Sequence, residues 1–197
     1  QIFVTPKQGG GTRHYELAKY LVELGHQVTV IASDTDYLSN IKTTKQKEIL
    51  DGITIIYAKT LSALHKNILW RALAFLSFSY SCIRLSLQIK NVDVIWGTSP
   101  PLFQAFSALL ISKIKRKPFV FEVRDLWIDF AKQLKVIKNP IIIFIFKKLE
   151  KQLYKHADHL IVNSPGFIPF IKKIVPNKTI SLFPNGVIPE EFNNLCP

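Results

Sequence analysis

Hydrophobic and polar residues alternate along the chain with two different periods. Short runs of β-branched and aromatic residues are typical of strands, and apolar residues three or four positions apart are typical of helices. The first unit is a strand over residues 2–5, a glycine-rich turn over 6–11, a helix over 12–24 ended by Gly25, and a strand over 27–32. Strand, helix and strand in this close succession predict a βαβ unit.

The rest of the chain repeats this alternation. Further strands are predicted over residues 53–57, 93–96, 118–123, 158–163 and 179–183, and further helices over 67–90, 102–114, 140–156 and 165–173. The pattern indicates an α/β fold, with a Rossmann-like, doubly wound and mostly parallel sheet of about seven strands. The length of 197 residues fits one domain, residues 1–197. Ligands of such sheets bind beyond the carboxyl ends of the strands, so the loops there are the candidate sites.

The loop after the first predicted strand carries three consecutive glycines. Without Cβ atoms the backbone can approach a ligand closely, and the helix N-terminus behind it offers free N–H groups to a phosphate. The alternative interpretation is a flexible turn that binds nothing. A dinucleotide fingerprint does not fit, because its third glycine falls on a histidine. The residues predicted to bind a ligand here are Gly9, Gly10, Gly11, Thr12, Arg13 and His14.

Polar and charged residues also follow the other predicted strands. Glu122, Arg124 and Asp125 gather at one strand end, which is costly unless they pair with one another or meet a ligand. An ion pair of Arg124 with Asp125 or Glu122 is the structural alternative. Ser99 and Ser164 precede helices and can equally be helix caps. The other candidates on these loops are Thr98, Asn163, Asn185 and Gly186.

The charge balance points to an anionic partner. The formal net charge is +12 and the isoelectric point is about 9.7, which suits nucleic acid, an acidic membrane surface or a phosphorylated small molecule. No nucleic acid is expected, because neither interleaved aromatic residues nor a known reading motif is visible. Cys82 and Cys196 form no disulfide framework and have no zinc-ligand spacing, so we predict no metal and a reducing cytosol. The sequence starts at Gln1 and holds no methionine, from which we expect further residues in the gene product.

One predicted helix combines an apolar run with a row of lysines. Residues 141–146 are apolar, and Lys147, Lys151 and Lys155 follow four positions apart, on one helical face. This combination suits the surface of an anionic bilayer. The alternative is a helix start packed in the core with a solvated outer face. No stretch is long and apolar enough to predict a membrane span.

Taken together, these loops resemble a known family. Three glycines followed by HYELAKYLVELGHQVTVIAS, then DVIWGTSPP, FVFEVRDLW, ADHLIVNSPG and PNGV, resemble the N-terminal half of retaining family-4 glycosyltransferases with the GT-B fold. The sequence is most similar in character to bacterial enzymes that build O-antigen or capsule, such as the WbuB-like N-acetyl-fucosamine transferases. The resemblance covers almost the whole chain, and the motifs follow one another in the order that the family has.

The resemblance implies a division of labour between two Rossmann-like domains. The N-terminal domain chiefly binds a saccharide or polyprenyl-phosphate-linked acceptor, and the C-terminal domain, which lies outside residues 1–197, holds the nucleotide-sugar. The chain would then be the acceptor half of a hexosyl or N-acetylhexosaminyl transferase, inactive alone, with no cofactor or metal. Its location would be the cytoplasm, including the inner face of the membrane. The rival hypotheses are a module that binds a phosphorylated ligand and half of a GT-B sugar-nucleotide epimerase.

The resemblance also suggests roles for single residues. Residues 9–11 would line the cleft near the donor diphosphate, with Arg13 and His14 beside them. Relatives carry His-Asp after the fifth strand, whereas this chain has Arg124 and Asp125, its candidate catalytic pair. A guanidinium stays protonated, so Arg124 is better suited to bind an acceptor phosphate or to pair with a charge than to transfer protons. Ile188 replaces the acid of the family's PNGVD motif.

Overall fold

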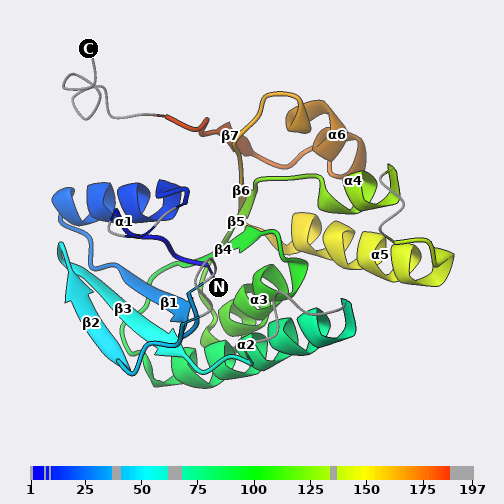
Figure 1. The fold of residues 1–197 in the computed structure, drawn as a ribbon. Coiled ribbons are helices and arrows are strands. Elements are labelled where there is room, and N and C mark those ends of the chain that lie inside the picture. The colour runs from blue at the N-terminus through cyan, green and yellow to red at the C-terminus, as the bar shows by residue number, and fades with distance from the viewer. Residues whose placement is uncertain are drawn as a thin grey trace, which may run out of the picture.

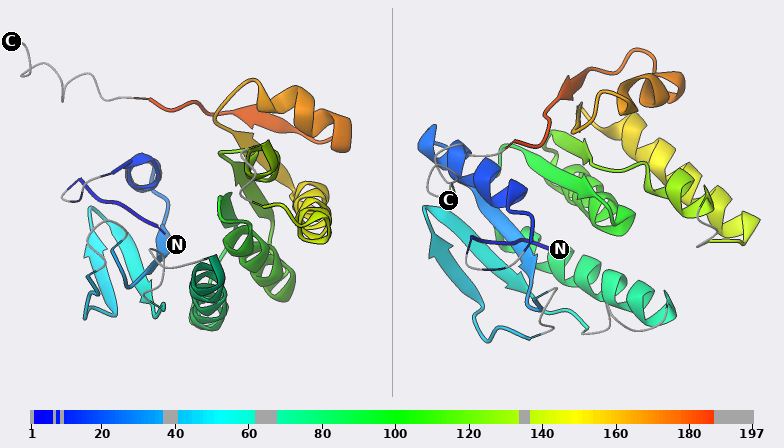
Figure 2. Two further views of the ribbon diagram at one scale, coloured as in Figure 1. Left: turned by 45° about the vertical axis from the view of Figure 1, so that its right-hand side comes forward. Right: turned by 45° about the horizontal axis from the view of Figure 1, so that its top comes forward.

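The fold is built from two sheets with helices packed around them (Figure 1). The structure is a computed structural model that describes residues 2–6, 8, 10–36, 41–61, 68–133 and 137–186. The sheets are a four-stranded parallel sheet and a three-stranded mixed sheet. Figure 2 shows that the mixed sheet and α1 (Arg13–Glu23) lie on one side of the molecule and the parallel sheet on the other.

The parallel sheet has the strand order β4-β5-β6-β7. Its strands are β4 (Ile95–Ser99), β5 (Phe119–Val123), β6 (His159–Val162) and β7 (Ile180–Leu182). The helices between them are α3 (Leu102–Lys115), α4 (Trp127–Gln133), α5 (Pro140–His156) and α6 (Phe167–Ile174). Each strand reaches its parallel neighbour through helix, as the chain direction requires.

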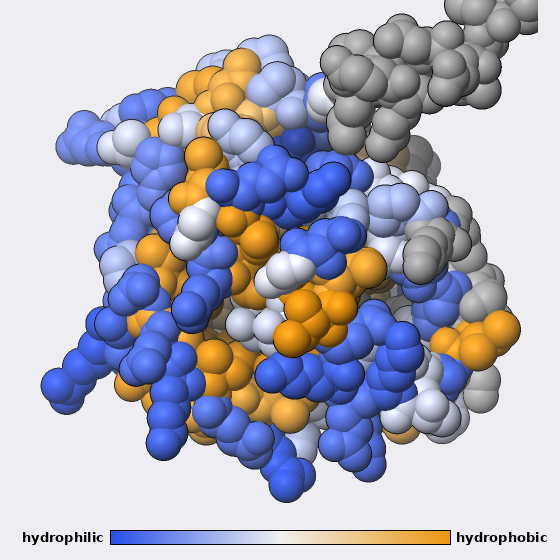
Figure 3. Space-filling view, turned by 90° about the vertical axis from the view of Figure 1, so that its left-hand side faces the viewer, coloured by the Kyte–Doolittle hydropathy of each residue, from blue (hydrophilic) through white to orange (hydrophobic). Residues whose placement is uncertain are grey.

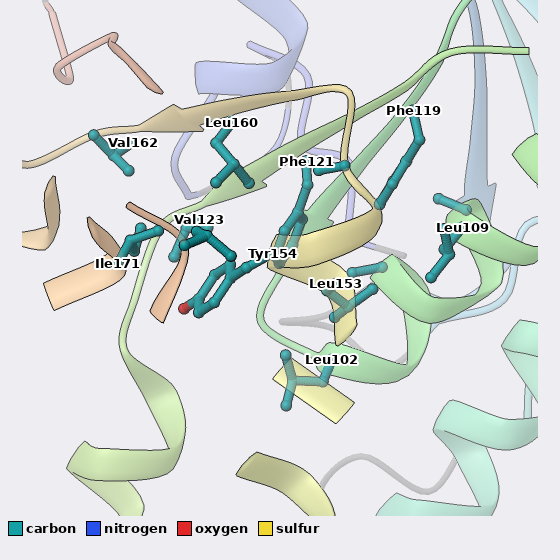
Figure 4. Packing of buried hydrophobic residues seen from close by; sticks show 14 of the residues in the cluster. Leu102, Leu109, Phe119, Phe121, Val123, Leu153, Tyr154, Leu160, Val162 and Ile171 are labelled. Atoms are coloured by element: carbon teal, nitrogen blue, oxygen red, sulfur yellow. The ribbon is translucent and has the colours of Figure 1, made fainter. Parts of the chain in front are cut away.

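The larger core lies between the parallel sheet and its helices. Phe119, Phe121 and Val123 alternate along β5 toward α5, where Leu153 and Tyr154 are fully buried (Figure 4). The rings of Phe119 and Phe121 stack at a centroid distance of 5.9 Å. The intervening side chains of β5, including Glu122, therefore lie on the opposite face of the sheet.

The mixed sheet supports α1. Its strands are β1 (Thr29–Ser33), β2 (Lys47–Leu50) and β3 (Ile53–Ala58), in the order β1-β3-β2, and β2 is the antiparallel edge strand. Tyr15 and Ala18 of α1 pack with Ile53 and Ile55 in a second, smaller core. The long helix α2 (Ile68–Gln88) follows β3 and packs against α3. Hydrophobic residues on the face that carries α1 and β2 form patches between hydrophilic ones (Figure 3).

We predicted one sheet of about seven strands, and each of the two observed sheets is smaller than that. The parallel sheet has four strands, and three more lie in the mixed sheet. Residues 2–5 form no strand, so this prediction is wrong. At Thr5 a turn begins: the Thr5 N–H donates to Gln8 Oε1 at 3.0 Å, and the Gln8 N–H donates to the Thr5 carbonyl at 2.9 Å. This turn occupies the backbone groups that Thr5 would use as the last residue of a strand.

Three other elements differ from prediction. Strand β2 was not expected; Asp51 and Gly52 join it to β3, both with positive φ (49° and 79°), the conformation of a tight hairpin turn. Helix α4 was also missed. Strand β4 runs to Ser99 instead of ending at residue 96, so Thr98 and Ser99 are its last residues and do not belong to a loop.

No helix in the part of the chain that the structure describes is both long and apolar enough to cross a membrane.

Candidate functional site

Polar side chains gather at the carboxyl edge of the parallel sheet. Thr98 in β4 is in register with Glu122 in β5, so their side chains lie on the same face. Arg124 follows the last residue of β5, and Asn163 follows the last residue of β6; these last residues, Val123 and Val162, are in register. Three neighbouring strands thus bring four predicted site residues to one edge, as the parallel topology requires.

Glu122 is the buried centre of this edge. Its side chain is fully buried, Arg13 Nε donates to its Oε1 at 2.9 Å, and His14 Nε2 lies 2.9 Å from its Oε2. Burial acts to raise the pKa of Glu122, but the hydrogen bonds and charges of His14 and Arg13 outweigh burial and lower it to about 2. Glu122 is therefore a carboxylate at neutral pH, and it draws the first turn of α1 onto the parallel sheet.

Arg13 joins α1 to the segment after β7. Beyond its bond to Glu122, its Nη2 donates to the carbonyl oxygen of Phe183 at 2.8 Å, and its Nη1 donates to the carbonyl oxygen of Pro184 at 2.9 Å. The same Nη1 lies 3.3 Å from Asn185 Oδ1. All three guanidinium nitrogens are bound to the protein, so in this arrangement Arg13 holds the site together. A contact of Arg13 with a phosphate stays a prediction.

Three buried polar atoms at the same edge have no hydrogen-bond partner. They are Thr98 Oγ1, Arg124 Nε and Asn163 Oδ1. An unsatisfied buried donor or acceptor costs about 1–3 kcal/mol, so such atoms usually mark a place where a ligand or water completes the bonding. One cationic donor, one hydroxyl and one amide oxygen together suit a polar ligand with hydroxyl groups and a negative charge.

The glycine-rich bend lies next to this edge, because the residues that follow it bind Glu122. Gly10 has a φ of +132°, and a Cβ there would lie 3.4 Å from Val4 Cγ2; at Gly11 no atom lies within 4 Å. Both glycines are exposed. Thr12 is the N-cap of α1, but its side chain makes no capping bond. Gly9 lies outside the described residues.

Neither predicted serine cap is confirmed. The N-cap of α3 is Pro101 and that of α6 is Gly166. Ser99 is buried, and its carbonyl accepts from the N–H of Arg124 at 3.2 Å. The carbonyl of Ser164 accepts from the N–H of Phe167 at 3.2 Å.

The charged neighbours of Arg124 also differ from the structural alternative. Glu122 pairs with Arg13 and His14 and not with Arg124. Asp125 is exposed, and so is Gly186, the last residue that the structure describes. Within the described ranges, no group of three or more His, Cys, Asp or Glu residues is placed to hold a metal ion.

The fold and this edge define a Rossmann-like α/β protein with a polar site beyond its parallel strands, the architecture of one half of a GT-B glycosyltransferase. The family model for Glycosyltransferase Family 4 matches residues 8–191. The chain belongs to glycosyltransferase family 4.

A solved structure supports the fold assignment. The chain is similar to the sucrose-phosphate synthase from Thermosynechococcus elongatus, with a TM-score of 0.66 and 13% sequence identity. The similarity covers 96% of this chain and 48% of that enzyme's chain, so this chain spans about half its length. At this identity the likeness concerns the fold alone. A search of curated proteins finds no significant match.

Proposed function

We propose that the chain forms the acceptor side of a glycosyltransferase. The enzyme would transfer a hexosyl or N-acetylhexosaminyl group from a nucleotide-sugar to a saccharide or polyprenyl-phosphate-linked acceptor, in O-antigen or capsule synthesis of the WbuB-like kind. The observation that carries the proposal is the set of three unpartnered polar atoms at the carboxyl edge of the parallel sheet, in a chain of this family. A second domain outside residues 1–197 would bind the donor.

Arg124 is the proposed anion-binding residue of the acceptor site. The planar fork of a guanidinium forms paired hydrogen bonds to phosphate. Its buried Nε is free to donate, and Thr98 Oγ1 and Asn163 Oδ1 are free to bond to sugar hydroxyls. Asp125, adjacent to Arg124 and exposed, is the carboxylate we assign to the acceptor's reacting hydroxyl.

Glu122 has a different proposed role. Its pKa of about 2 and its hydrogen bonds with Arg13 and His14 make it a poor proton acceptor at neutral pH. We assign it to positioning: it holds α1, and with it the glycine bend, against the acceptor site. The bend and the free N–H groups at the start of α1 would then face the donor diphosphate. No metal or cofactor is part of the proposal, and the proposed location is the cytoplasm, including the inner face of the membrane.

The test is kinetic and uses the complete gene product with a panel of nucleotide-sugars and acceptors. Arg124→Ala should lower kcat/KM for a phosphorylated acceptor by about 100-fold, and Arg124→Lys should restore part of it, since a lysine keeps the charge but not the paired geometry. The KM for the nucleotide-sugar should stay unchanged.

The control is Arg84→Ala, which removes an exposed arginine in the C-terminal half of α2. Equal effects of the two alanine variants would refute the acceptor site. Epimerisation of the nucleotide-sugar without transfer would refute the transferase. Residues 1–197 alone should bind acceptor without transferring sugar, and turnover by this segment would contradict the division of labour.

A further inference from the structure

The outer surface of α5 begins with exposed apolar residues. Ile141, Phe144 and Ile145 are 67%, 68% and 57% exposed, although an average globular surface seldom places such residues together. They occupy positions i, i+3 and i+4, so they lie on one face of the helix. This face points away from the core, where Glu150, Leu153 and Tyr154 are buried. The alternative that the helix start packs in the core is therefore wrong for these three residues.

Neighbouring helices also expose apolar residues. Phe130 of α4 is exposed, as are Trp70, Leu73 and Leu76 near the start of α2. We call these four residues, together with Ile141, Phe144 and Ile145, the helix-end surface. The N-terminal ends of α2 and α5 lie at the right-hand side of Figure 1 and come forward in the left view of Figure 2.

A chain of aromatic rings ties these helices together at that end. Phe75 of α2 stacks with Phe103 of α3 at 6.4 Å, and Phe103 meets Phe146 of α5 edge-on at 5.8 Å. Phe146 in turn meets Trp127 of α4 edge-on at 5.9 Å. The rings hold the first turns of α3 and α4 and the adjoining parts of α2 and α5 in one layer.

Lysines continue the same face of α5. Lys148 stands at i+7 from Ile141, and Lys151 and Lys155 extend the row; all three are exposed. The nearby carboxylates do not cancel this charge. Asp129 accepts from Lys147 Nζ at 2.8 Å, and Glu150 is buried, with burial chiefly raising its pKa to about 7. The outer face of α5 is thus apolar in its first turns and cationic in the rest.

We propose that the helix-end surface and the lysine row of α5 dock the protein on the surface of an anionic lipid bilayer. The charge of the lysine row, in a chain of net charge +12, selects this partner over an apolar protein surface. Helix α5 has 17 residues and is apolar only over its first turns, so it lies in the interface with its first turns inserted among the lipids. Trp70 suits the same boundary, where tryptophan places its ring at headgroup level.

The docking surface lies beside the candidate site. Helix α3 starts directly after β4 and α4 starts four residues after β5, at the edge that carries Thr98 and Arg124. A bilayer on the helix-end surface therefore lies against the end of the molecule where the acceptor would bind. If the proposed function holds, the acceptor comes from the membrane as a lipid-linked phosphate. The docking itself does not depend on sugar transfer.

The experiment is flotation of the complete gene product with vesicles of phosphatidylcholine, and with vesicles of equimolar phosphatidylcholine and phosphatidylglycerol. The wild type should bind the anionic vesicles at least about tenfold more tightly than the neutral ones, and salt should weaken this binding. The double variant Phe144→Ser/Ile145→Ser should lower the affinity for anionic vesicles about tenfold or more, because it removes the inserted apolar residues.

A matched pair of charge reversals separates the lysine row from net charge. Lys148→Glu/Lys151→Glu should weaken binding to anionic vesicles about tenfold or more, whereas Lys90→Glu/Lys113→Glu, which changes the net charge equally at exposed sites away from α5, should have a much smaller effect. Circular dichroism confirms that each variant is folded. The proposal is overturned by equal binding to both vesicle types, by equal effects of the two lysine pairs, or by a dimer in the absence of lipid that Phe144→Ser/Ile145→Ser dissociates.

Discussion

At the scale of single residues, Glu122 connects parts of the chain that are far apart in sequence. It receives Arg13 and His14 from α1, more than a hundred positions earlier, and it does so on the otherwise apolar strand β5. A buried carboxylate is tolerated only when its charge is matched, and two cationic or hydrogen-bonding partners at 2.9 Å supply that match. Its place on the sheet face opposite the main core leaves it within reach of α1.

Glu122→Gln should destabilise the protein in a pH-dependent manner. The pKa of Glu122 falls from 4.5 to about 2 on folding, so its contribution is fully present above pH 4.5 and is lost as the pH falls through about 2. Urea titrations should show a decrease in unfolding free energy of about 2–3 kcal/mol at pH 7 and below about 1 kcal/mol at pH 2. Glu23→Gln, at an exposed end of α1, is the control. A loss that is the same at both pH values would contradict the assignment.

At the scale of elements, close packing decides details that periodicity does not show. Helix α5 begins and ends at the predicted residues, and α3 and β6 were predicted to within about one residue at each end. Their apolar patterns are long or bounded by turn residues, which makes the ends easy to locate. Strand β4 was predicted to end too early, because Gly97 is a poor strand former and Pro100 and Pro101 follow closely. Gly97 is needed there: a Cβ would lie 2.6 Å from Ala108 Cβ of α3.

Gly97→Ala should therefore destabilise the protein by about 1–3 kcal/mol, since the added methyl group forces α3 away from β4. The measurement is the midpoint of urea unfolding at constant slope. Gly11→Ala serves as the matched control, because no atom lies within 4 Å of its Cβ position. If the two variants unfold at the same midpoint, the close approach of β4 and α3 does not restrict this site.

The hairpin of β2 and β3 could have been predicted. Asp51 and Gly52 form the dipeptide that favours a two-residue hairpin turn, and residues 47–50 precede it with alternating burial. The charged residues of β2 concealed the strand, because Lys47 and Glu48 lower its strand propensity. An edge strand tolerates these residues, since one side of it faces solvent.

At the scale of the whole molecule, Arg13 links the side of the mixed sheet to the end of the parallel sheet. Its guanidinium bonds to Glu122 in β5 and to the carbonyls of Phe183 and Pro184 after β7. Arg13 thus sets how α1 and the glycine bend sit relative to the chain segment that leaves the parallel sheet.

Arg13→Ala should loosen the segment after β7 more than it loosens the core strands of the parallel sheet. Amide exchange of Phe183, whose N–H donates to the Val162 carbonyl at 2.8 Å, should rise about tenfold or more, because Arg13 alone bonds to the Phe183 and Pro184 carbonyls and the Asn185 side chain among the contacts described for this segment. Exchange of Phe121 and Leu160, in the core strands, should change much less. Arg84→Ala should leave all of these amides unchanged. Unaltered exchange of Phe183 in Arg13→Ala would show that the link is not formed in solution.

The sequence by itself determined the fold class, most of the helices, and the loops at which polar residues gather, because hydrophobic period and turn chemistry are local properties. Only the tertiary structure decided which of these residues meet. Residues 2–5 form no strand, Glu122 pairs with Arg13 and His14 instead of Arg124, and the start of α5 exposes Ile141, Phe144 and Ile145. These outcomes depend on register and on packing between distant segments, and a hydrophobic pattern along one chain does not specify either.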